Sequence, residues 1–133
     1  MIFVDTAFVV AWISPNDALH IRAVELLNKI RREQWLTTDC VLLEIGNSLA
    51  RIHRAEAIRV IENFLSDEKI EVVGLDANLF SRAFELFRTR NDKSWGLIDC
   101  VSFVVMKEHE VTDALTNDRH FQQAGFKALM RDT

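Results

Sequence analysis

Short apolar runs alternate along the chain with longer segments of helical periodicity. Three to five residues rich in apolar side chains, bounded by polar residues, predict buried strands. The predicted strands are residues 2–4, 35–37, 71–73 and 114–116, with residues 126–130 as an additional edge strand. Helical segments separate these strands, so we expect parallel pairing through right-handed crossovers. The pattern predicts an α/β fold, a three-layer α/β/α sandwich with a central parallel sheet of four or five strands.

Apolar residues recur every three or four positions between the predicted strands, which is the spacing of one helix face. In the predicted helix over residues 17–32 this face holds Ile21, Val24, Leu27 and Ile30. Thr38 is placed to cap a helix reaching about Ile52. Its core face is expected to contain Val41, Leu42, Ile45, Leu49 and Ile52. Two further helices are predicted over residues 7–13 and 56–65. A third begins after Asp76 or Asn78 and carries Phe80, Ala83, Phe84 and Phe87. The last two are a segment around Asp99 and residues 118–124.

Composition indicates one ordinary globular domain. We expect residues 1–133 to form it, because one proline, four glycines and no Ser/Gly-rich linker leave no domain boundary. The two cysteines lie far apart, which favours free thiols in a reducing cytoplasm. Neither a basic leader nor an apolar run long enough to cross a bilayer is present, so a cytoplasmic protein with no membrane partner is predicted.

Four carboxylates stand out against this background. Asp99 lies inside the almost wholly apolar residues 95–106, where an unpartnered ionised carboxylate costs several kcal/mol. Asp5 and Asp118 each follow a predicted strand, and Glu44 lies inside the apolar run of residues 41–45, at the margin of the helix face. Ligands of parallel sheets bind beyond the carboxyl ends of strands, so Asp5 and Asp118 lie on the expected binding edge. The four groups therefore predict a cation site.

Each carboxylate also has a structural interpretation. Asp5 and Asp118 are placed to cap helices, Asp99 would be favoured by the dipole of a first turn, and a mid-helix Glu is usually at the surface. As a set, the oxygen ligands suit Mg²⁺ or Mn²⁺. Zinc prefers His or Cys, and the four histidines show no ligand spacing. The net charge of −4 becomes −4 + 4 = 0 without these four groups, so nucleic acid is not excluded as a substrate.

Four motifs carry a resemblance to a known family. They are Ile-Phe-Val-Asp-Thr at residues 2–6, Glu44 followed by Asn47, Asp-Lys-Ser-Trp-Gly-Leu-Ile-Asp opening residues 92–106, and Leu-Thr-Asn-Asp-Arg-His-Phe opening residues 115–126. Over essentially its whole length the chain resembles PIN-domain proteins, specifically VapC-type toxin ribonucleases. The resemblance implies that Asp5, Glu44, Asp99 and Asp118 bind one or two Mg²⁺ or Mn²⁺ ions. It also implies hydrolysis of RNA, with transfer RNA as one candidate, leaving 5′-phosphate and 3′-hydroxyl ends, and it implies a VapB-like antitoxin and a homodimer.

Further residues are candidates for supporting roles. Thr6, Asn47 and Thr116 have short polar groups beside the carboxylates and are expected to orient them. Candidates for RNA contacts are Arg88, Arg90, Lys93, Trp95 and His120. For the three cations a solvated helix end is the competing interpretation, and for Trp95 a place in the core.

Other functions fit the sequence less well. VapC-like chains commonly have Ser-Leu-Thr-Asp where this chain has Gly-Leu-Ile-Asp at residues 96–99, so a catalytically weakened scaffold or RNA-binding subunit is the alternative hypothesis. A haloacid-dehalogenase phosphatase needs a second Asp where Ala7 stands. A receiver domain needs a phospho-accepting Asp after its third strand, where Val73 and Gly74 stand.

Overall fold

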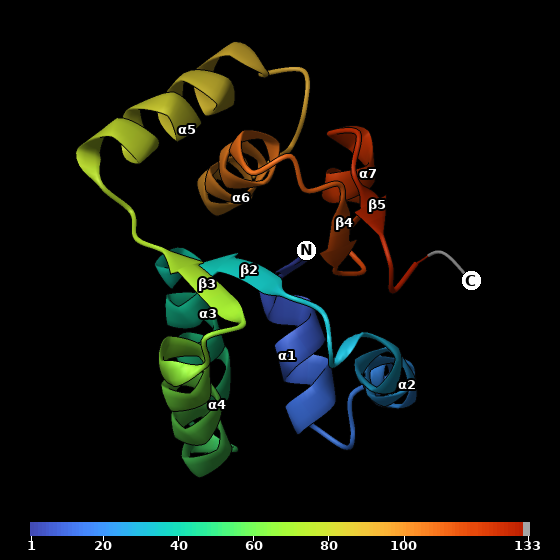
Figure 1. The fold of residues 1–133 in the computed structure, drawn as a ribbon. Coiled ribbons are helices and arrows are strands. Elements are labelled where there is room, and N and C mark those ends of the chain that lie inside the picture. The colour runs from blue at the N-terminus through green and yellow to red at the C-terminus, as the bar shows by residue number, and fades with distance from the viewer. Residues whose placement is uncertain (132–133) are drawn as a thin grey trace.

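A computed structural model describes residues 1–131, which form a parallel sheet flanked by helices (Figure 1). The strands are β1 (Ile2–Val4), β2 (Trp35–Thr38), β3 (Ile70–Val73), β4 (Asp113–Leu115) and β5 (Lys127–Ala128). The helices are α1 (Thr6–Ile13), α2 (His20–Ile30), α3 (Asp39–Leu49), α4 (Arg54–Ser66), α5 (Ala77–Thr89), α6 (Leu97–Glu108) and α7 (Arg119–Gln123). The domain predicted over residues 1–133 includes residues 132 and 133, which lie outside the described residues.

The sheet has the order β3-β2-β1-β4-β5, and all neighbouring strands are parallel. Starting from β1, the chain adds β2 and then β3 on one side of β1, and it adds β4 and then β5 on the other side. Right-handed crossovers in opposite directions place their helices on opposite faces. Figure 1 accordingly shows α1 to α4 on one side of the sheet and α5 to α7 on the other. The predicted α/β/α sandwich is confirmed.

The core lies on both faces of the central strands. Phe3 pairs with Leu36 of β2 and with Ala114 of β4, and all three side chains are fully buried. Each large apolar side chain buried in this way contributes about 1.5–3 kcal/mol. Cys40 and Cys100 are both free and buried, as expected for structural thiols.

The start of α2 and its buried face differ from the periodicity. Residues 17–19 form a turn in which the Asp17 carboxylate accepts a hydrogen bond from the Leu19 N–H at 2.8 Å, so α2 begins only at His20. The buried face of α2 consists of Ala23, Leu26 and Ile30. Ile21 is 73% exposed, so the prediction that it belongs to the core was wrong.

The end of α3 and the edge strand were also predicted too long. The helix ends at Leu49, and Ile52 beyond its end is 69% exposed. The chain then turns into α4 through His53, whose φ of 68° is left-handed. The predicted strand over residues 126–130 is reduced to β5. Within residues 1–131, every helix is too short or too polar to cross a bilayer.

Candidate active site

The four predicted carboxylates line one open pocket of about 890 Å³. Asp5 follows β1 directly, and Asp118 lies three residues beyond β4. These neighbouring strands flank the point where strand order reverses, the usual ligand position in a parallel sheet. Glu44 reaches the pocket from α3 and Asp99 from the first turn of α6. The fold thus brings together residues that are up to 113 positions apart, from Asp5 to Asp118.

Asp5 has the most perturbed pKa of these carboxylates. Burial raises its pKa from 3.8 to about 7, with smaller contributions in the same direction from Glu44 and Asp99. Hydrogen bonds from Thr116 and from the Thr6 backbone oppose the increase. A carboxylate is held here in an environment that penalises its charge. A cation would compensate this penalty.

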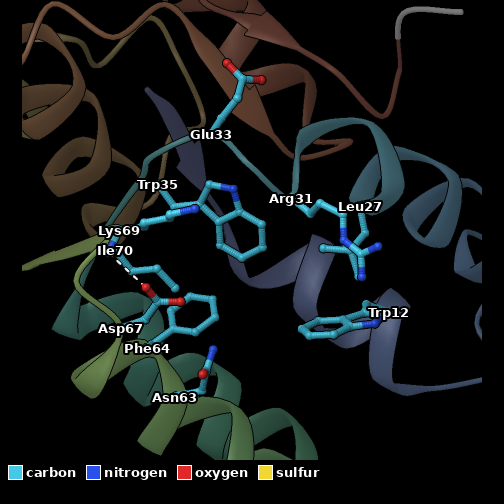
Figure 2. Close-up of a pocket in the computed structure, with 10 residues that line it drawn as sticks. All are labelled: Trp12, Leu27, Arg31, Glu33, Trp35, Asn63, Phe64, Asp67, Lys69 and Ile70. Carbon is cyan, nitrogen blue, oxygen red and sulfur yellow. Dashed lines mark hydrogen bonds between the residues drawn. The ribbon is translucent and has the colours of Figure 1, made fainter.

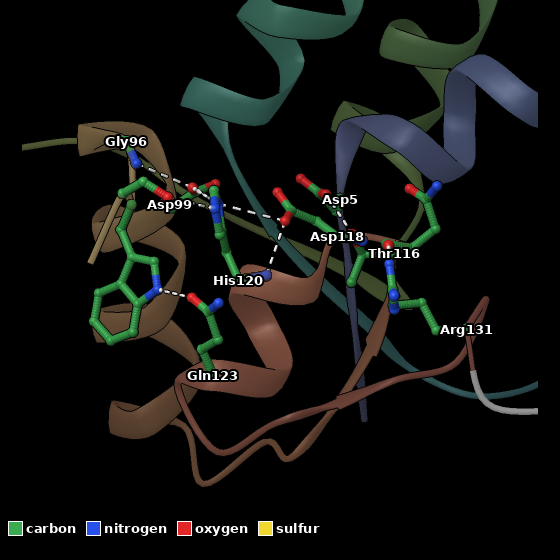
Figure 3. Close-up of polar contacts among 11 residues, drawn as sticks. Asp5, Gly96, Asp99, Thr116, Asp118, His120, Gln123 and Arg131 are labelled. Atoms are coloured by element: carbon green, nitrogen blue, oxygen red, sulfur yellow. Dashed lines mark hydrogen bonds and ion pairs between the residues drawn. The ribbon is translucent and has the colours of Figure 1, made fainter. Parts of the chain in front are cut away.

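Two threonine hydroxyls fix the orientation of the carboxylates. The Thr116 hydroxyl donates to Asp5 Oδ2 at 2.7 Å and accepts the Asp118 N–H at 3.1 Å, which links the two strand ends (Figure 3). The Thr6 hydroxyl donates to Glu44 Oε1 at 2.7 Å, which connects α1 with α3. Thr6 and Thr116 therefore have the geometry expected of orienting residues. Asn47 is exposed on α3 and is not among the residues that line the pocket, whereas its neighbour Ser48 is.

The environment of Asp99 differs from the sequence-based expectation. Its side chain is 22% exposed, so it is less desolvated than the surrounding apolar residues suggested. Asp99 Oδ2 accepts the Gly96 N–H at 3.1 Å and faces His120 Nδ1 at 3.1 Å. The helix-capping interpretation and the site interpretation therefore both apply to this residue. The Gly96 backbone thus fixes one oxygen of this carboxylate.

His120 lies between two carboxylates, as Figure 3 shows. Its Nδ1 is 3.1 Å from Asp99 Oδ2 and 3.4 Å from Asp118 Oδ1, and its Nε2 is 3.2 Å from the Ser94 hydroxyl. The backbone N–H of His120 also donates to Asp118 Oδ1 at 2.8 Å, so the Asp118 side chain caps α7. The sequence motif singled out His120 as a substrate contact, and the fold brings its ring into contact with the carboxylates themselves.

Trp95 belongs to the core. It is 5% exposed, packs edge-on against Phe103 at 5.0 Å between ring centroids, and donates from Nε1 to Gln123 Oε1 at 3.0 Å. The Arg90 guanidinium covers its ring at 4.9 Å. No free face remains for a stacked base, so the expected RNA contact at Trp95 is not supported.

The predicted cations lie outside the pocket lining. Arg88 pairs with Glu85 at 2.6 Å and Arg90 with Asp92 at 3.0 Å, and neither these arginines nor Lys93 is among the residues that form the pocket. Two other arginines, Arg119 and Arg131, do line it. Arg119 follows Asp118 in the motif and could have been found there. Arg131 is positioned by a hydrogen bond to the Asn117 carbonyl at 3.0 Å, which no sequence pattern indicated.

The donor set fits a hard divalent cation. Aspartate and glutamate oxygens are the protein ligands preferred by Mg²⁺ and Mn²⁺. Donor atoms of Asp99, Asp118 and His120 lie within 4.8 Å of one another. Asp5 adds a desolvated carboxylate to the same pocket. We therefore assign this pocket as a candidate metal centre.

A second pocket, of about 230 Å³, lies near the amino ends of β2 and β3 (Figure 2). Trp12, Trp35 and Phe64 contribute to its walls, and charged groups such as Arg31 and Lys69 also line it. Figure 2 shows the Lys69 N–H bound to the Asp67 carboxylate, a contact of 2.9 Å that closes a turn. Its lining lacks the converging carboxylates that distinguish the candidate metal centre.

Comparisons with known proteins identify the family of this chain. The PIN domain family matches residues 2–127. The chain is 30% identical over 128 residues to the 23S rRNA-specific endonuclease VapC20 of Mycobacterium tuberculosis, and the alignment covers 95% of both chains.

Solved structures show the same relationship. The crystal structure of Mycobacterium tuberculosis VapC20, described as a sarcin–ricin loop cleaving toxin, superposes with a TM-score of 0.84 and 27% identity over 95% of this chain and 96% of that one. FitAcB from Neisseria gonorrhoeae shares the fold, with a TM-score of 0.66 and 19% identity over 96% of each chain. The family model covers residues 2–127 and the 30% identical relative covers 95% of the chain, so the chain belongs to the PIN domain family.

Proposed function

We infer that this protein is a metal-dependent endoribonuclease and the toxin of a VapB–VapC-like pair. The observation that carries this inference is the convergence of Asp5, Glu44, Asp99 and Asp118 at the switch point of the sheet. The relative named a 23S rRNA-specific endonuclease aligns over 95% of the chain, which supports RNA hydrolysis as the reaction.

We propose ribosomal RNA as the substrate, in preference to the transfer RNA considered from the motifs alone. The support is the similarity to VapC20, whose structure is described as that of a sarcin–ricin loop cleaving toxin. An exposed RNA loop also suits the open, solvent-accessible pocket, because RNA-binding proteins usually read unpaired loops. A ribosomal substrate would place the protein in the cytoplasm.

In this mechanism the four carboxylates hold Mg²⁺ or Mn²⁺, one or two ions per site. A divalent cation bound there lowers the pKa of water and stabilises negative charge on the phosphodiester. Thr6 and Thr116 hold Glu44 and Asp5 in fixed orientations through their 2.7 Å hydrogen bonds. Preorganised ligands of this kind lower the cost of assembling the site.

Arg119 and Arg131 are proposed to bind the RNA backbone. Both line the pocket and both are exposed, so their guanidinium groups are accessible to phosphates. Guanidinium groups bind phosphate through paired hydrogen bonds. They also offset the negative charge of the carboxylates, which would otherwise repel RNA in this acidic chain.

The alternative of an inactive scaffold rests on Gly96 and Ile98. The Gly96 N–H holds Asp99 Oδ2 at 3.1 Å, so the carboxylate is oriented without the missing serine hydroxyl. This contact favours the active enzyme. A VapB-like antitoxin that covers the pocket, and a homodimer, complete the proposed assembly.

Cleavage of ribosomal RNA by antitoxin-free protein tests the function. We expect cleavage of 23S rRNA with Mg²⁺ or Mn²⁺ and none in EDTA, with 5′-phosphate product ends. Asp5→Asn and Asp99→Asn should each lower the rate by at least about 100-fold, the upper end of what groups supporting a metal ligand contribute. Asp113→Asn is the matched control, since Asp113 begins β4 at the opposite edge of the sheet. Equal cleavage in EDTA, or an active Asp5→Asn variant, would contradict the metal mechanism.

A further inference from the structure

We propose that His120 supplies an imidazole nitrogen to the divalent metal, beside Asp99 and Asp118, and that this ligand favours Mn²⁺ over Mg²⁺. The inference rests on the proposed ribonuclease site and adds a nitrogen donor to an otherwise all-carboxylate ligand set. No sequence spacing among the histidines indicated such a role.

The distances match the edges of a coordination octahedron. Ligand bonds of about 2.1 Å at right angles separate neighbouring donor atoms by about 3.0 Å. Nδ1 of His120 is 3.1 Å from Asp99 Oδ2 and 3.4 Å from Asp118 Oδ1. All three residues have donor atoms within 4.8 Å of one another. One ion can therefore contact all three side chains with only small movements.

The ring is held in this position from several directions. The backbone N–H of His120 donates to Asp118 Oδ1 at 2.8 Å and fixes the main chain that carries the ring, and the next residue, Phe121, packs on Phe3 of β1 and on Phe103 of α6. The side chain is only 19% exposed. A histidine placed this firmly between two carboxylates loses little conformational entropy when it binds an ion.

Ser94 allows the ring to change tautomer. Nδ1 lies 3.1 Å from Asp99 Oδ2 and Nε2 lies 3.2 Å from the Ser94 hydroxyl, and a ring protonated on Nδ1 satisfies both contacts. A ring that holds a metal through Nδ1 would carry its proton on Nε2, which faces Ser94. The Ser94 hydroxyl then accepts from Nε2–H, because a hydroxyl both donates and accepts. A metal-ligating histidine is usually supported in this way through its second nitrogen.

A nitrogen ligand changes which metals bind best. Carboxylate and water ligands suit Mg²⁺ and Mn²⁺ alike, whereas imidazole favours transition metals. We therefore expect wild type to bind Mn²⁺ more tightly than Mg²⁺, and His120→Gln to lose roughly tenfold or more of that preference.

Pulsed electron paramagnetic resonance of the Mn²⁺ complex tests the ligand directly. Untagged, antitoxin-free protein is loaded with MnCl₂, and electron spin echo modulation is examined for a directly coordinated ¹⁴N. We expect the coupling in wild type and its loss in His120→Gln, with Mn²⁺ still bound. His20→Gln is the control that retains the coupling, since the His20 ring lies against the Ala11 carbonyl instead. Calorimetric Mn²⁺ and Mg²⁺ titrations of the same proteins give the affinity ratio.

The outcomes distinguish the ligand role of His120 from the ribonuclease proposal. A wild-type Mn²⁺ complex without nitrogen coupling, or coupling that persists in His120→Gln, would overturn the ligand role while leaving the ribonuclease proposal intact. Failure of wild type to bind Mn²⁺ at all would overturn both. The wild-type spectrum decides the question even where His120→Gln folds poorly, and melting in EDTA checks that variant.

Discussion

Asp5 shows how a single buried residue couples stability to function. Its pKa of about 7 in the folded protein lies above the value of 3.8 that an exposed aspartate has. Between these pH values the folded state retains a proton that the unfolded state has released. The free energy of unfolding of the metal-free protein therefore decreases as pH rises through this window, and the loss is complete above about pH 7.

Asp5→Asn should remove this pH dependence. The amide keeps the Thr116 hydrogen bond but carries no charge, so in EDTA at pH 8 the variant should melt at least about 3 °C above wild type, roughly the effect of 1 kcal/mol in a chain of this size. At pH 4 the melting temperatures of wild type and Asp5→Asn should be nearly equal. With millimolar Mn²⁺ the order should reverse, because wild type gains stability from the bound ion. Melting curves at pH 4–8 measure this, and parallel pH profiles of both proteins would contradict it.

At the scale of elements, an aromatic cluster holds α6 against α7. Phe103 of α6 packs edge-on against Trp95 and Phe121, each 5.0 Å away between ring centroids, and lies 5.7 Å from Phe126. Trp95 adds its hydrogen bond to Gln123 of α7. Because Asp99 lies in the first turn of α6 and Asp118 caps α7, this cluster sets the separation between two carboxylates of the site.

Phe103→Ala should weaken both the fold and the metal centre. Removing a buried phenylalanine ring costs about 3–5 kcal/mol, and the freed space lets α6 shift relative to α7. We expect a lower denaturation midpoint in urea and a raised Mn²⁺ dissociation constant. Leu65→Ala, an exposed apolar residue on α4, serves as the control and should change stability by about 0.5 kcal/mol or less. An unchanged midpoint for Phe103→Ala would refute the role of the cluster.

At the scale of the whole molecule, α5 exposes an apolar stripe. Phe80, Phe84 and Phe87 follow helical spacing and are all exposed, with the first two rings stacked at 6.2 Å. An apolar patch of this kind on a small protein marks an interaction surface. We predict that this stripe is buried in the proposed homodimer.

Light scattering at micromolar concentration should give about twice the chain mass of 15.3 kDa. Phe84→Glu should shift the protein to the monomer, because a charge would be buried at the interface. Glu85→Gln, on a different side of the same helix, should remain dimeric. A monomeric wild type would exclude this role for the stripe.

Much of the architecture could be predicted from local patterns. Strands β1 to β4, the parallel sheet and the position of Asp5 and Asp118 at strand ends follow from short apolar runs separated by helical segments. Burial patterns in strands and capping at helix starts depend on residues close in sequence, so they can be predicted from the sequence. Thr6 and Thr116 were found for the same reason, since each lies beside a strand end.

Long-range geometry required the tertiary structure. Periodicity placed Ile21 in the core, but the face of α2 that is buried depends on which neighbours it meets. Trp95 and His120 lie in similar positions near site carboxylates in the sequence, yet one is packed into the core and the other faces Asp99. Arg131 reaches the pocket only because β5 returns beside β4. Sequence determines the chemistry available at each position, whereas desolvation and contact distance depend on atoms contributed by segments far apart in the chain.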